Sequence, residues 1–298
     1  MINKRIKFSI LIIIPIIFWA CAFPFIKFLL TESGLSFINL TIMRFLVVCT
    51  ALFLIYIIFN KKFDRLRKKD TIPIFIIGFF GIIVYHLSLN YGEQYVSAGV
   101  ASLIIATIPI FVLILSVVYL KEKLTIKKIL GILISLFGVI IISLYGTANS
   151  KIEITYITGA IGVIIAALMG AFYTIVGKKM LERYSGFSLT MYAMLFGSVG
   201  LIPFYNNQLI PQIRSLSIYA WGAIIFLGLF STITAYTFWY IALKEKDASV
   251  ISTYLYATPI LSTIISMIII NEQITYYFVL GGFLVIFGLI LVNLKKKN

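Results

Sequence analysis

The sequence is poor in charged residues, and above all in acidic ones. Only ten of its 298 residues are aspartate or glutamate, one is histidine, and charged residues make up 12% of the chain. A catalytic centre would need a metal-ligand cluster, a pair of buried acids or a Ser/His/Asp set, and the sequence has no pattern of this kind. We therefore expect neither an enzyme nor a bound metal or cofactor.

Cysteines and nucleotide-binding motifs are also scarce. The two cysteines, Cys21 and Cys49, both lie in apolar stretches, where a cysteine usually packs as a small hydrophobic residue, so no disulfide framework is expected. The phosphate-binding pattern G-x-x-x-x-G-K-[ST] does not occur, so ATP is not expected to drive the protein.

Apolar residues dominate the rest of the sequence. They make up 61% of the chain, far above the share in a soluble domain, and they gather in runs of about twenty residues, the length that crosses a hydrocarbon core of about 30 Å. We predict an all-α integral membrane protein with ten transmembrane helices. The expected segments are residues 8–30, 37–59, 72–92, 97–120, 126–145, 156–177, 187–205, 217–242, 248–270 and 276–294.

The 25 lysines and arginines outnumber the ten acidic residues, which gives a net charge of +15. Their placement along the sequence decides what this charge means. When alternate loops are assigned to opposite sides of a membrane, most of these residues fall on one side, including those in residues 61–69 and 295–297. The positive-inside rule then places both termini in the cytoplasm of a multi-pass protein of the cell membrane. Because the charge follows the topology, no nucleic-acid partner is expected.

The sequence matches itself at an offset of 150 residues. Each half holds five apolar segments, an odd number, so the second half is predicted to be inverted relative to the first. Such inverted repeats are typical of transporters that bind their substrate near the middle of the membrane. We expect one five-helix repeat in residues 1–147 and an inverted one in residues 148–298. Matched positions include Ala98 and Ala248, Ser102 and Ser252, Pro109 and Pro259, Glu122 and Glu272, Thr125 and Thr275, and Gly138 and Gly288.

The repeated segments resemble a known family. AGVASLIIATIPIFVLILSVVYLKEKLT and its partner ASVISTYLYATPILSTIISMIIINEQIT, with FWACAFPFIK in the first segment, are similar to the paired repeats of the EamA family in the drug/metabolite transporter superfamily. The resemblance implies a ten-helix metabolite carrier. Trp19 belongs to the family's first-helix pattern and is a substrate-binding candidate, and Arg44 stands where many members carry an arginine. Ala20, Cys21 and Ala22 replace the Gly, Ser and Asn of many members, which removes polar atoms from the first helix.

Two prolines mark predicted helix breaks near the middle of the membrane. Pro109 and Pro259 each lie inside an apolar segment, where a proline removes the hydrogen bond to the carbonyl four residues earlier, that of Ile105 or Leu255. A freed carbonyl in hydrocarbon needs a polar partner or a polar cavity. We expect the two breaks to line a binding site, with a packing kink as the alternative.

The third and eighth helices are the most polar. On the third helix, His86 and Asn90 lie one turn apart on the same face. The offset of 150 maps this pair onto Tyr236 and Tyr240, so we expect both faces to border one cavity, with an interfacial aromatic belt as the alternative for residues near helix ends. A similar pair occurs on the ninth helix. The candidate substrate-binding residues on these helices are His86, Asn90, Tyr236, Tyr240, Ser252 and Tyr256.

Arg44 is the charged residue that lies deepest in a predicted helix, roughly 10 Å below its outer end at about 1.5 Å per residue. A charge in the membrane is costly, so a substrate-binding role is expected, with a structural arginine bonded to carbonyls or to Glu93 as the alternative. No acidic residue lies well within a predicted segment, and Glu93 lies at an outer end. A cavity whose ionisable groups are Arg44, Lys27 and His86 suits a solute with a carboxylate or phosphate.

Together these features favour a secondary transporter that moves small organic metabolites, most of all amino acids or related carboxylate-bearing solutes, outward by alternating access. The expected partners are the solute and the lipid bilayer, and the sequence is compatible with a monomer. A membrane receptor or assembly subunit without transport activity is the alternative. Glu122 and its match Glu272 are predicted to be structural, because each precedes a helix-capping threonine, Thr125 or Thr275, at opposite faces.

Overall fold

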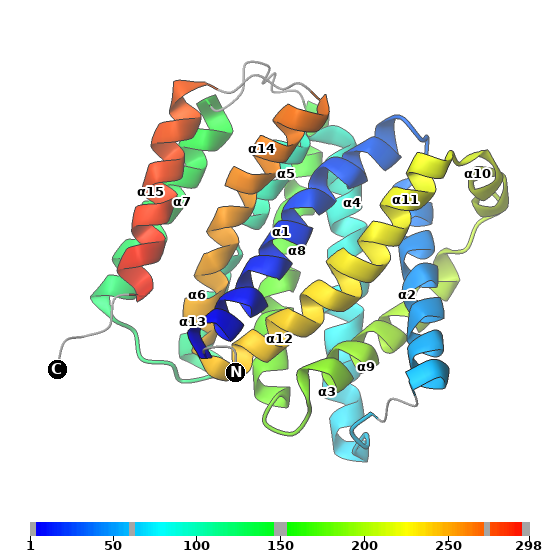
Figure 1. Cartoon of the computed structure of the whole chain (residues 1–298), viewed down its shortest axis with the longest axis horizontal. Helices are drawn as coiled ribbons and strands as arrows, with labels where there is room; N and C mark the ends of the chain where they lie inside the picture. Colours follow the sequence, from blue (N-terminus) through cyan, green and yellow to red (C-terminus); the bar gives the residue numbers. More distant parts are fainter. Residues whose placement is uncertain (1–3, 60–62, 146–153, 271–274, 294–298) are drawn as a thin grey trace.

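The computed structural model describes residues 4–59, 63–145, 154–270 and 275–293, and these form a bundle of helices without a strand (Figure 1). The elements, in chain order, are α1 (Lys4–Thr31), α2 (Phe37–Phe59), η1 (Lys68–Asp70), α3 (Thr71–Gly78), η2 (Phe79–Val84), α4 (Tyr85–Tyr95), α5 (Ala98–Ile105), α6 (Ile108–Tyr119), α7 (Ile126–Tyr145), α8 (Ile154–Met180), α9 (Gly186–Val199), η3 (Ile202–Phe204), α10 (Leu209–Ser215), α11 (Ile218–Phe226), η4 (Leu227–Thr234), α12 (Ala235–Glu245), α13 (Ala248–Ser252), η5 (Thr253–Tyr256), α14 (Ala257–Ile270) and α15 (Tyr276–Asn293).

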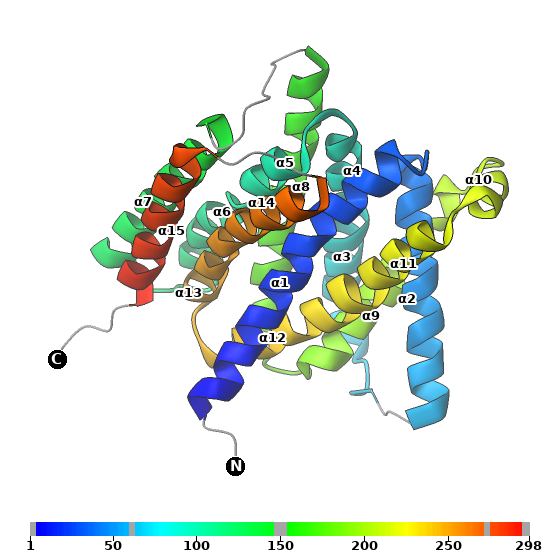
Figure 2. The same ribbon diagram turned by 45° about the horizontal axis from the view of Figure 1, so that its top comes forward.

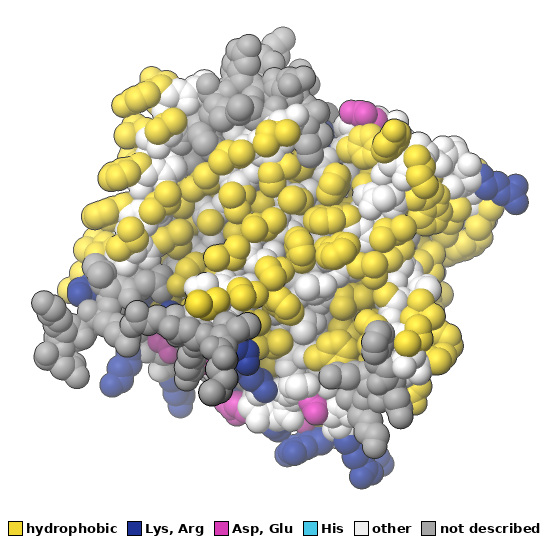
Figure 3. Space-filling model, viewed as in Figure 1, with side chains coloured by type: hydrophobic (Ala, Val, Ile, Leu, Met, Phe, Trp, Pro, Cys, Tyr) yellow, Lys and Arg dark blue, Asp and Glu magenta, His cyan; other side chains and the backbone are white. Residues whose placement is uncertain are grey.

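Eight helical segments of the described chain are long and apolar enough to cross a membrane. They are Ile6–Thr31, Phe37–Ile58, Lys68–Tyr95, Ala98–Tyr119, Tyr156–Met180, Gly186–Phe204, Ile218–Glu245 and Ala248–Ile265. The two other segments expected from the sequence are occupied by α7 and α15, and in α15 the apolar stretch is the shorter Val279–Val292. The face shown in Figure 3 is hydrophobic across its middle, as a surface in contact with lipid would be.

Lysines and arginines gather at one end of the bundle, along the lower edge of Figure 3, which we call the basic end. Here α6 and α12 both pack against α8, and the loop after α8 contacts Asp70, just before α3. Lys179 at the end of α8 lies 4.9 Å from the centre of the Tyr119 ring at the end of α6. Arg183 forms a 2.7 Å ion pair with Asp70, which is 1% exposed. We call the other end, where α1 and α4 terminate, the outer end.

Two of the long helical segments contain a wide turn that the sequence analysis did not predict. The segments η2, between α3 and α4, and η4, between α11 and α12, are π-helical, with hydrogen bonds that skip five residues instead of four. In η4 the hydroxyls of Thr232 and Thr234 donate to the carbonyls of Leu227 and Leu229, at 2.7 and 3.0 Å. Such turns often occur at functional sites, and these two face the middle of the bundle.

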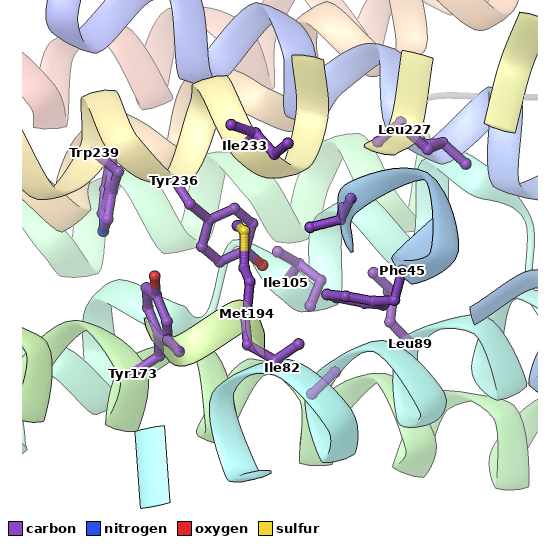
Figure 4. Packing of buried hydrophobic residues seen from close by; sticks show 14 of the residues in the cluster. Phe45, Ile82, Leu89, Ile105, Tyr173, Met194, Leu227, Ile233, Tyr236 and Trp239 are labelled. Carbon is purple, nitrogen blue, oxygen red and sulfur yellow. The ribbon is translucent and has the colours of Figure 1, made fainter. Parts of the chain in front are cut away.

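The main core lies between α1, α2, α4, α8, α9 and α12, and its side chains interdigitate around Tyr173, Tyr236 and Trp239 (Figure 4). The helices α7 and α15 pack against each other at one side of the bundle (Figures 1 and 2). Glycines allow this close approach: a Cβ atom on Gly288 would lie 2.4 Å from the carbonyl oxygen of Gly131. A smaller apolar cluster that includes Tyr256 connects this helix pair to the rest of the bundle.

Candidate functional site

Helices from both halves of the chain line a cavity of about 50 Å³ within the main core. This volume holds a few water molecules and is far smaller than the roughly 300–1,000 Å³ of an ordinary ligand pocket. Four of the residues proposed from the sequence line it, namely Trp19, Arg44, His86 and Tyr236. We call this conformation, in which the central cavity is too small for an amino acid, the closed conformation.

Arg44 reaches the cavity from α2 and is 2% exposed. Its Nε donates to the hydroxyl of Thr232 at 2.7 Å, and its Nη2 donates to the hydroxyl of Ser231 at 3.1 Å. Both partners belong to the π-helical turn η4, which brings two neutral acceptors towards α2. Among the described residues, no carboxylate forms an ion pair with this guanidinium. The structural alternative of a direct bond to Glu93 is therefore not what the structure shows.

His86 and Tyr236 meet across the cavity, from α4 and α12. The Tyr236 hydroxyl and the His86 Nε2 atom are 3.4 Å apart, and both side chains are buried. The His86 Nδ1 atom has no hydrogen-bond partner in the described part of the chain. The contact joins the two positions that the 150-residue offset maps onto each other.

Aromatic rings form the wall next to α1. The indole N–H of Trp19 donates to the carbonyl of Ser231 at 3.0 Å, which fixes the ring beside the π-helical turn. The Trp19 ring meets Tyr236 and Trp239 edge-to-face, with centroids 5.4 and 5.2 Å apart. Edge-to-face contacts of this kind hold aromatic side chains in fixed orientations. The aromatic wall adjoins the polar groups, because Trp19 and Arg44 both bind Ser231 and Tyr236 contacts His86.

The other candidates from the sequence do not line this cavity. Asn90, one turn beyond His86, donates to the Thr41 hydroxyl at 2.9 Å. Tyr240 stacks on the Tyr173 ring at 4.7 Å. Ser252 donates to the carbonyl of Ser249 within its own helix, and Tyr256 donates to the carbonyl of Ile132, at 3.2 and 3.3 Å. The four candidates that stand outside the wall are Asn90, Tyr240, Ser252 and Tyr256.

Both prolines follow an interruption of their helix. Pro109 lies at the start of α6, just after the turn that separates it from α5, and Pro259 lies near the start of α14, after the 3-10 turn η5. Ile105 and Leu255, whose carbonyls lose their helical donors, both belong to the wall of the cavity. The two helix breaks therefore border the same space from opposite halves.

Several wall residues were missed by the sequence analysis. Tyr173 and Thr174 reach the cavity from α8, and Thr258 from α14. The hydroxyls of Tyr173 and Thr258 have no hydrogen-bond partner among the described residues. The signal for Tyr173 and Thr174 in the sequence is their polarity within GAFYT, because the rest of this predicted segment is mostly apolar.

At the basic end, Glu122 connects the two halves. Its carboxylate accepts the backbone N–H groups of Ala248 at 2.7 Å and of Ser249 at 3.3 Å, the first residues of α13, and also the Ser249 hydroxyl. Lys128 lies 3.8 Å from Glu122 and 2.9 Å from Asp247. The structural role fits the prediction, but Glu122 caps the start of α13. The start of α7, where the sequence placed its effect, is capped by Thr125. Glu272 lies outside the described residues.

Outside the membrane-spanning segments, Asp64 ties the loop after α2 to the start of α9. The backbone N–H of Ser185 donates to the Asp64 carboxylate at 2.5 Å, and the Asp64 N–H donates to the Ser188 hydroxyl at 2.9 Å. The hydrogen bond from the Ser185 backbone is the main reason why the pKa of Asp64 lies below its usual value. This contact holds the two loops of the basic end together at neutral pH.

Known proteins are similar in sequence to this chain over most of its length. An uncharacterized transporter of Archaeoglobus fulgidus is 39% identical over 96% of this chain and 99% of its own. The uncharacterized transporter YdfC of Bacillus subtilis is 33% identical over 94% of this chain and 89% of its own. A probable terminal-alkyne amino-acid exporter of Streptantibioticus cattleyicolor is 28% identical over 95% of this chain and 92% of its own.

One solved structure matches 96% of this chain and 96% of its own with a TM-score of 0.71, and at 17% identity this likeness shows the fold alone. The sequence model of the EamA-like transporter family matches residues 6–144 and again residues 157–294. These relatives are transporters, so the chain is a membrane transporter and not an enzyme. The family resemblance found in the repeated segments is confirmed, and the chain belongs to the EamA-like transporter family.

Proposed function

We propose that this transporter exports amino acids or related small carboxylate-bearing solutes across the cell membrane by alternating access. The observation that carries the proposal is the buried Arg44 at the cavity, which has two neutral hydroxyl partners and, among the described residues, no carboxylate partner. A buried charge without an opposite charge is costly, and a solute carboxylate would supply the missing partner.

The chemistry of Arg44 favours a carboxylate over a neutral solute. A guanidinium has five N–H donors in a planar fork that matches a carboxylate through two parallel hydrogen bonds. Ser231 and Thr232 use one donor on each of two nitrogens and fix the plane of the group. The remaining donors are available to a solute that enters the cavity. Arg44 would then act as the anchor of the carboxylate.

The aromatic wall favours a solute with an apolar part beside its carboxylate. Trp19, Tyr236 and Trp239 present ring edges and faces to one side of the cavity. The name of one relative, a probable terminal-alkyne amino-acid exporter, describes a solute of this kind and its direction of movement. At about 50 Å³ the cavity must widen before an amino acid can enter, which agrees with a closed step of an alternating-access cycle.

Equivalent contacts in the two halves support the inverted repeat. Lys27 donates to the carbonyls of Glu93 and Val96 at the end of α4, at 2.8 and 3.0 Å. Lys178 donates to the carbonyls of Leu243 and Lys246 at the end of α12. The acceptors match at the offset of 150, yet the first set lies at the outer end and the second at the basic end. Two five-helix halves, in residues 1–147 and 148–298, would rock about the cavity between them.

By the positive-inside rule, the basic end would face the cytoplasm, together with both termini. Glu122 and Lys128 of the first half hold α13 of the second half at this end. These contacts would close the route from the cytoplasm and would have to break before a solute could enter from that side. Export then requires that the solute binds from the basic end and is released at the outer end.

The test is exchange of radiolabelled L-amino acids in reconstituted vesicles. Wild-type protein should exchange one or more of them, and Arg44→Gln should lose at least tenfold in exchange rate, because a charged hydrogen bond contributes about 1.5–3 kcal/mol. Arg44→Lys keeps the charge without the fork and should fall in between. Arg214→Gln, at an exposed arginine of α10, is the matched control and should exchange like wild type.

The outcomes of this experiment distinguish the separate parts of the proposal. Exchange by Arg44→Gln at the wild-type rate would overturn the carboxylate anchor. Exchange of cationic or neutral solutes, with none of the amino acids, would overturn the substrate class. If wild-type protein is folded but carries no solute at all, the receptor or assembly role is favoured instead.

A further inference from the structure

Glu93 is a fully buried acid without a partner. It lies in the last turns of α4, its residue exposure is 0%, and in the described structure neither carboxyl oxygen has a hydrogen bond or an ion pair. An acid at the outer end of a helix, where the sequence analysis placed Glu93, is often exposed. The packing of α4 against α1, α2 and α8 covers it instead.

The cations near Glu93 are occupied elsewhere. The Lys27 ammonium donates to three backbone carbonyls, those of Glu93, Gln94 and Val96, and these use its three N–H donors. Arg44 is directed to the hydroxyls of η4. Of the other elements packed against α4, η2 and α5 carry no titratable residue, and α8 places Gly159 and Val163 against its last turns.

An ionised carboxylate in this position would be very unfavourable. A buried charge without hydrogen bonds or a direct counter-charge carries a large desolvation penalty, whereas a neutral carboxyl group carries only that of an ordinary polar group. Lys27 and Arg44 act on Glu93 only through their field, because neither is within ion-pair distance of it. The geometry points to a protonated carboxyl group in this closed conformation.

The equivalent position in the second half argues against a purely structural role. Lys178 caps the end of α12 in the way that Lys27 caps the end of α4, and the residue that matches Glu93 there is Leu243, which is fully buried. The lysine cap and the packing therefore form equally well around an apolar side chain. The acid in the first half has a function that the fold itself does not require.

A line of unsatisfied polar atoms connects Glu93 to the cavity. His86, Asn90 and Glu93 follow one another at one-turn spacing on the same face of α4, over roughly 10 Å at about 1.5 Å per residue. The Nδ1 atom of His86, the Oδ1 atom of Asn90 and both carboxyl oxygens of Glu93 lack partners among the described residues, although all three side chains are at most 1% exposed. Water entering between α1, α2 and α4 would satisfy all of these atoms.

We propose that Glu93 is the proton-binding residue that couples solute export to proton entry, an inference that rests on the proposed transport function. When the outer end opens, the Glu93 carboxylate takes a proton from a hydronium ion and leaves a water molecule; no other bond forms or breaks. The closed conformation carries the neutral acid. When the basic end opens, water along the face of His86 and Asn90 accepts the proton, and the carboxylate is restored.

Infrared spectroscopy tests the protonation without any assumption about the solute. Wild-type protein in lipid at neutral pH should show the C=O stretching band of a protonated carboxyl group, and this band should be absent from Glu93→Gln. Glu32→Gln, at an exposed acid of the outer end, should keep the band. Should Glu93→Gln fail to fold, Glu93→Leu copies the natural arrangement at Leu243 and replaces it. A band that is absent from wild type, or unchanged in the Glu93 variant, overturns the proposal.

Vesicle transport tests the coupling. If one proton is exchanged per solute, an acidic outer face with a gradient of about one pH unit should support up to a tenfold concentration ratio of a radiolabelled L-amino acid that the wild type exchanges. Glu93→Gln should still exchange this amino acid in the absence of a gradient but should reach a ratio of about one. Loss of exchange in the wild type would reject the proposed function, whereas an intact tenfold ratio in Glu93→Gln would reject only the coupling.

Discussion

The contact of Glu122 with α13 predicts how the basic end opens. In the closed conformation one carboxylate, with a side chain that is 9% exposed, accepts two backbone N–H groups and the hydroxyl of Ser249. If the halves rock apart at this end, all three bonds must break. Glu122→Gln should therefore weaken the closed state relative to the open one while leaving the packing of each half unchanged.

The magnitude follows from what the substitution removes. Glutamine keeps one carbonyl acceptor for the N–H of Ala248 but turns an N–H donor towards the Ser249 N–H, and it loses the charge that faces the start of α13. Loss of a helix cap costs about 0.5–2 kcal/mol, and loss of a charge at a helix N-terminus costs about 0.3–1 kcal/mol. A net shift of about 1–2 kcal/mol changes the ratio of open to closed protein by a factor of about 5–30.

Thiol labelling measures this ratio. Thr258 lines the cavity, so Thr258→Cys in a background of Cys21→Ser and Cys49→Ser reports access to it. A membrane-impermeant maleimide added at the basic end should label this cysteine 5–30 times faster when Glu122→Gln is also present. Glu182→Gln, at an exposed acid of the same end, should leave the rate unchanged.

Two results would refute this reasoning. Labelling from the basic end within a factor of two of the parent would mean that Glu122 only stabilises the loop and does not hold the halves together. Faster labelling from the outer end would mean that the basic end is not the one that Glu122 closes. Neither result depends on the identity of the solute, so the test stands apart from the experiments on Arg44 and Glu93.

Two further predictions concern stability. Gly288→Ala should lower the melting temperature, because its Cβ would lie 2.4 Å from the backbone carbonyl oxygen of Gly131 and must separate α7 from α15, whereas Gly282→Ala, with 3.9 Å of clearance, should not. The pKa of Asp64 is lowered by the Ser185 N–H, so the stability that this bond contributes is present above the unfolded pKa of about 4 and is lost as the pH falls through the folded pKa. The melting temperature of wild type should exceed that of Asp64→Asn at neutral pH, and the difference should vanish in acid. Equal melting temperatures of the two glycine variants would contradict the first prediction, and a difference between wild type and Asp64→Asn that does not change with pH would contradict the second.

The sequence was sufficient for features that depend on composition and local spacing. Apolar runs located the long helices, and eight of them meet the length and hydropathy of a membrane span. Trp19 could be proposed from the family resemblance, and Arg44, His86 and Tyr236 from polar or charged positions inside apolar runs. In the structure all four line one cavity. The family resemblance rested on repeated Pro, Glu and Gly positions, which apolar composition alone does not produce.

The remaining features depend on contacts between distant residues. Glu122 caps a helix that starts 126 residues later, and no local pattern identifies that partner. Tyr173 packs against the π-helical turn η2, where a Cβ atom on Gly81 would collide with the tyrosine side chain, and no local pattern identifies this contact. The full burial of Glu93 was not predicted, because the sequence locates the end of α4 but not the neighbours that cover it. Helix ends are therefore where reading the sequence was least informative.

Differences between equivalent positions locate function better than the shared positions do. The Lys27 and Lys178 caps serve the same structural purpose at opposite ends. His86 meets Tyr236, its own equivalent, and the pair joins an ionisable ring to a phenol at the centre of the molecule. An inverted repeat built of identical halves would present the same groups to both sides of the membrane, so a residue that occurs in one half only distinguishes the two sides. Glu93, which has an apolar equivalent and no hydrogen-bond partner for its carboxyl group in the described chain, is such a residue, and its substitution should remove the proposed coupling to protons before it removes exchange.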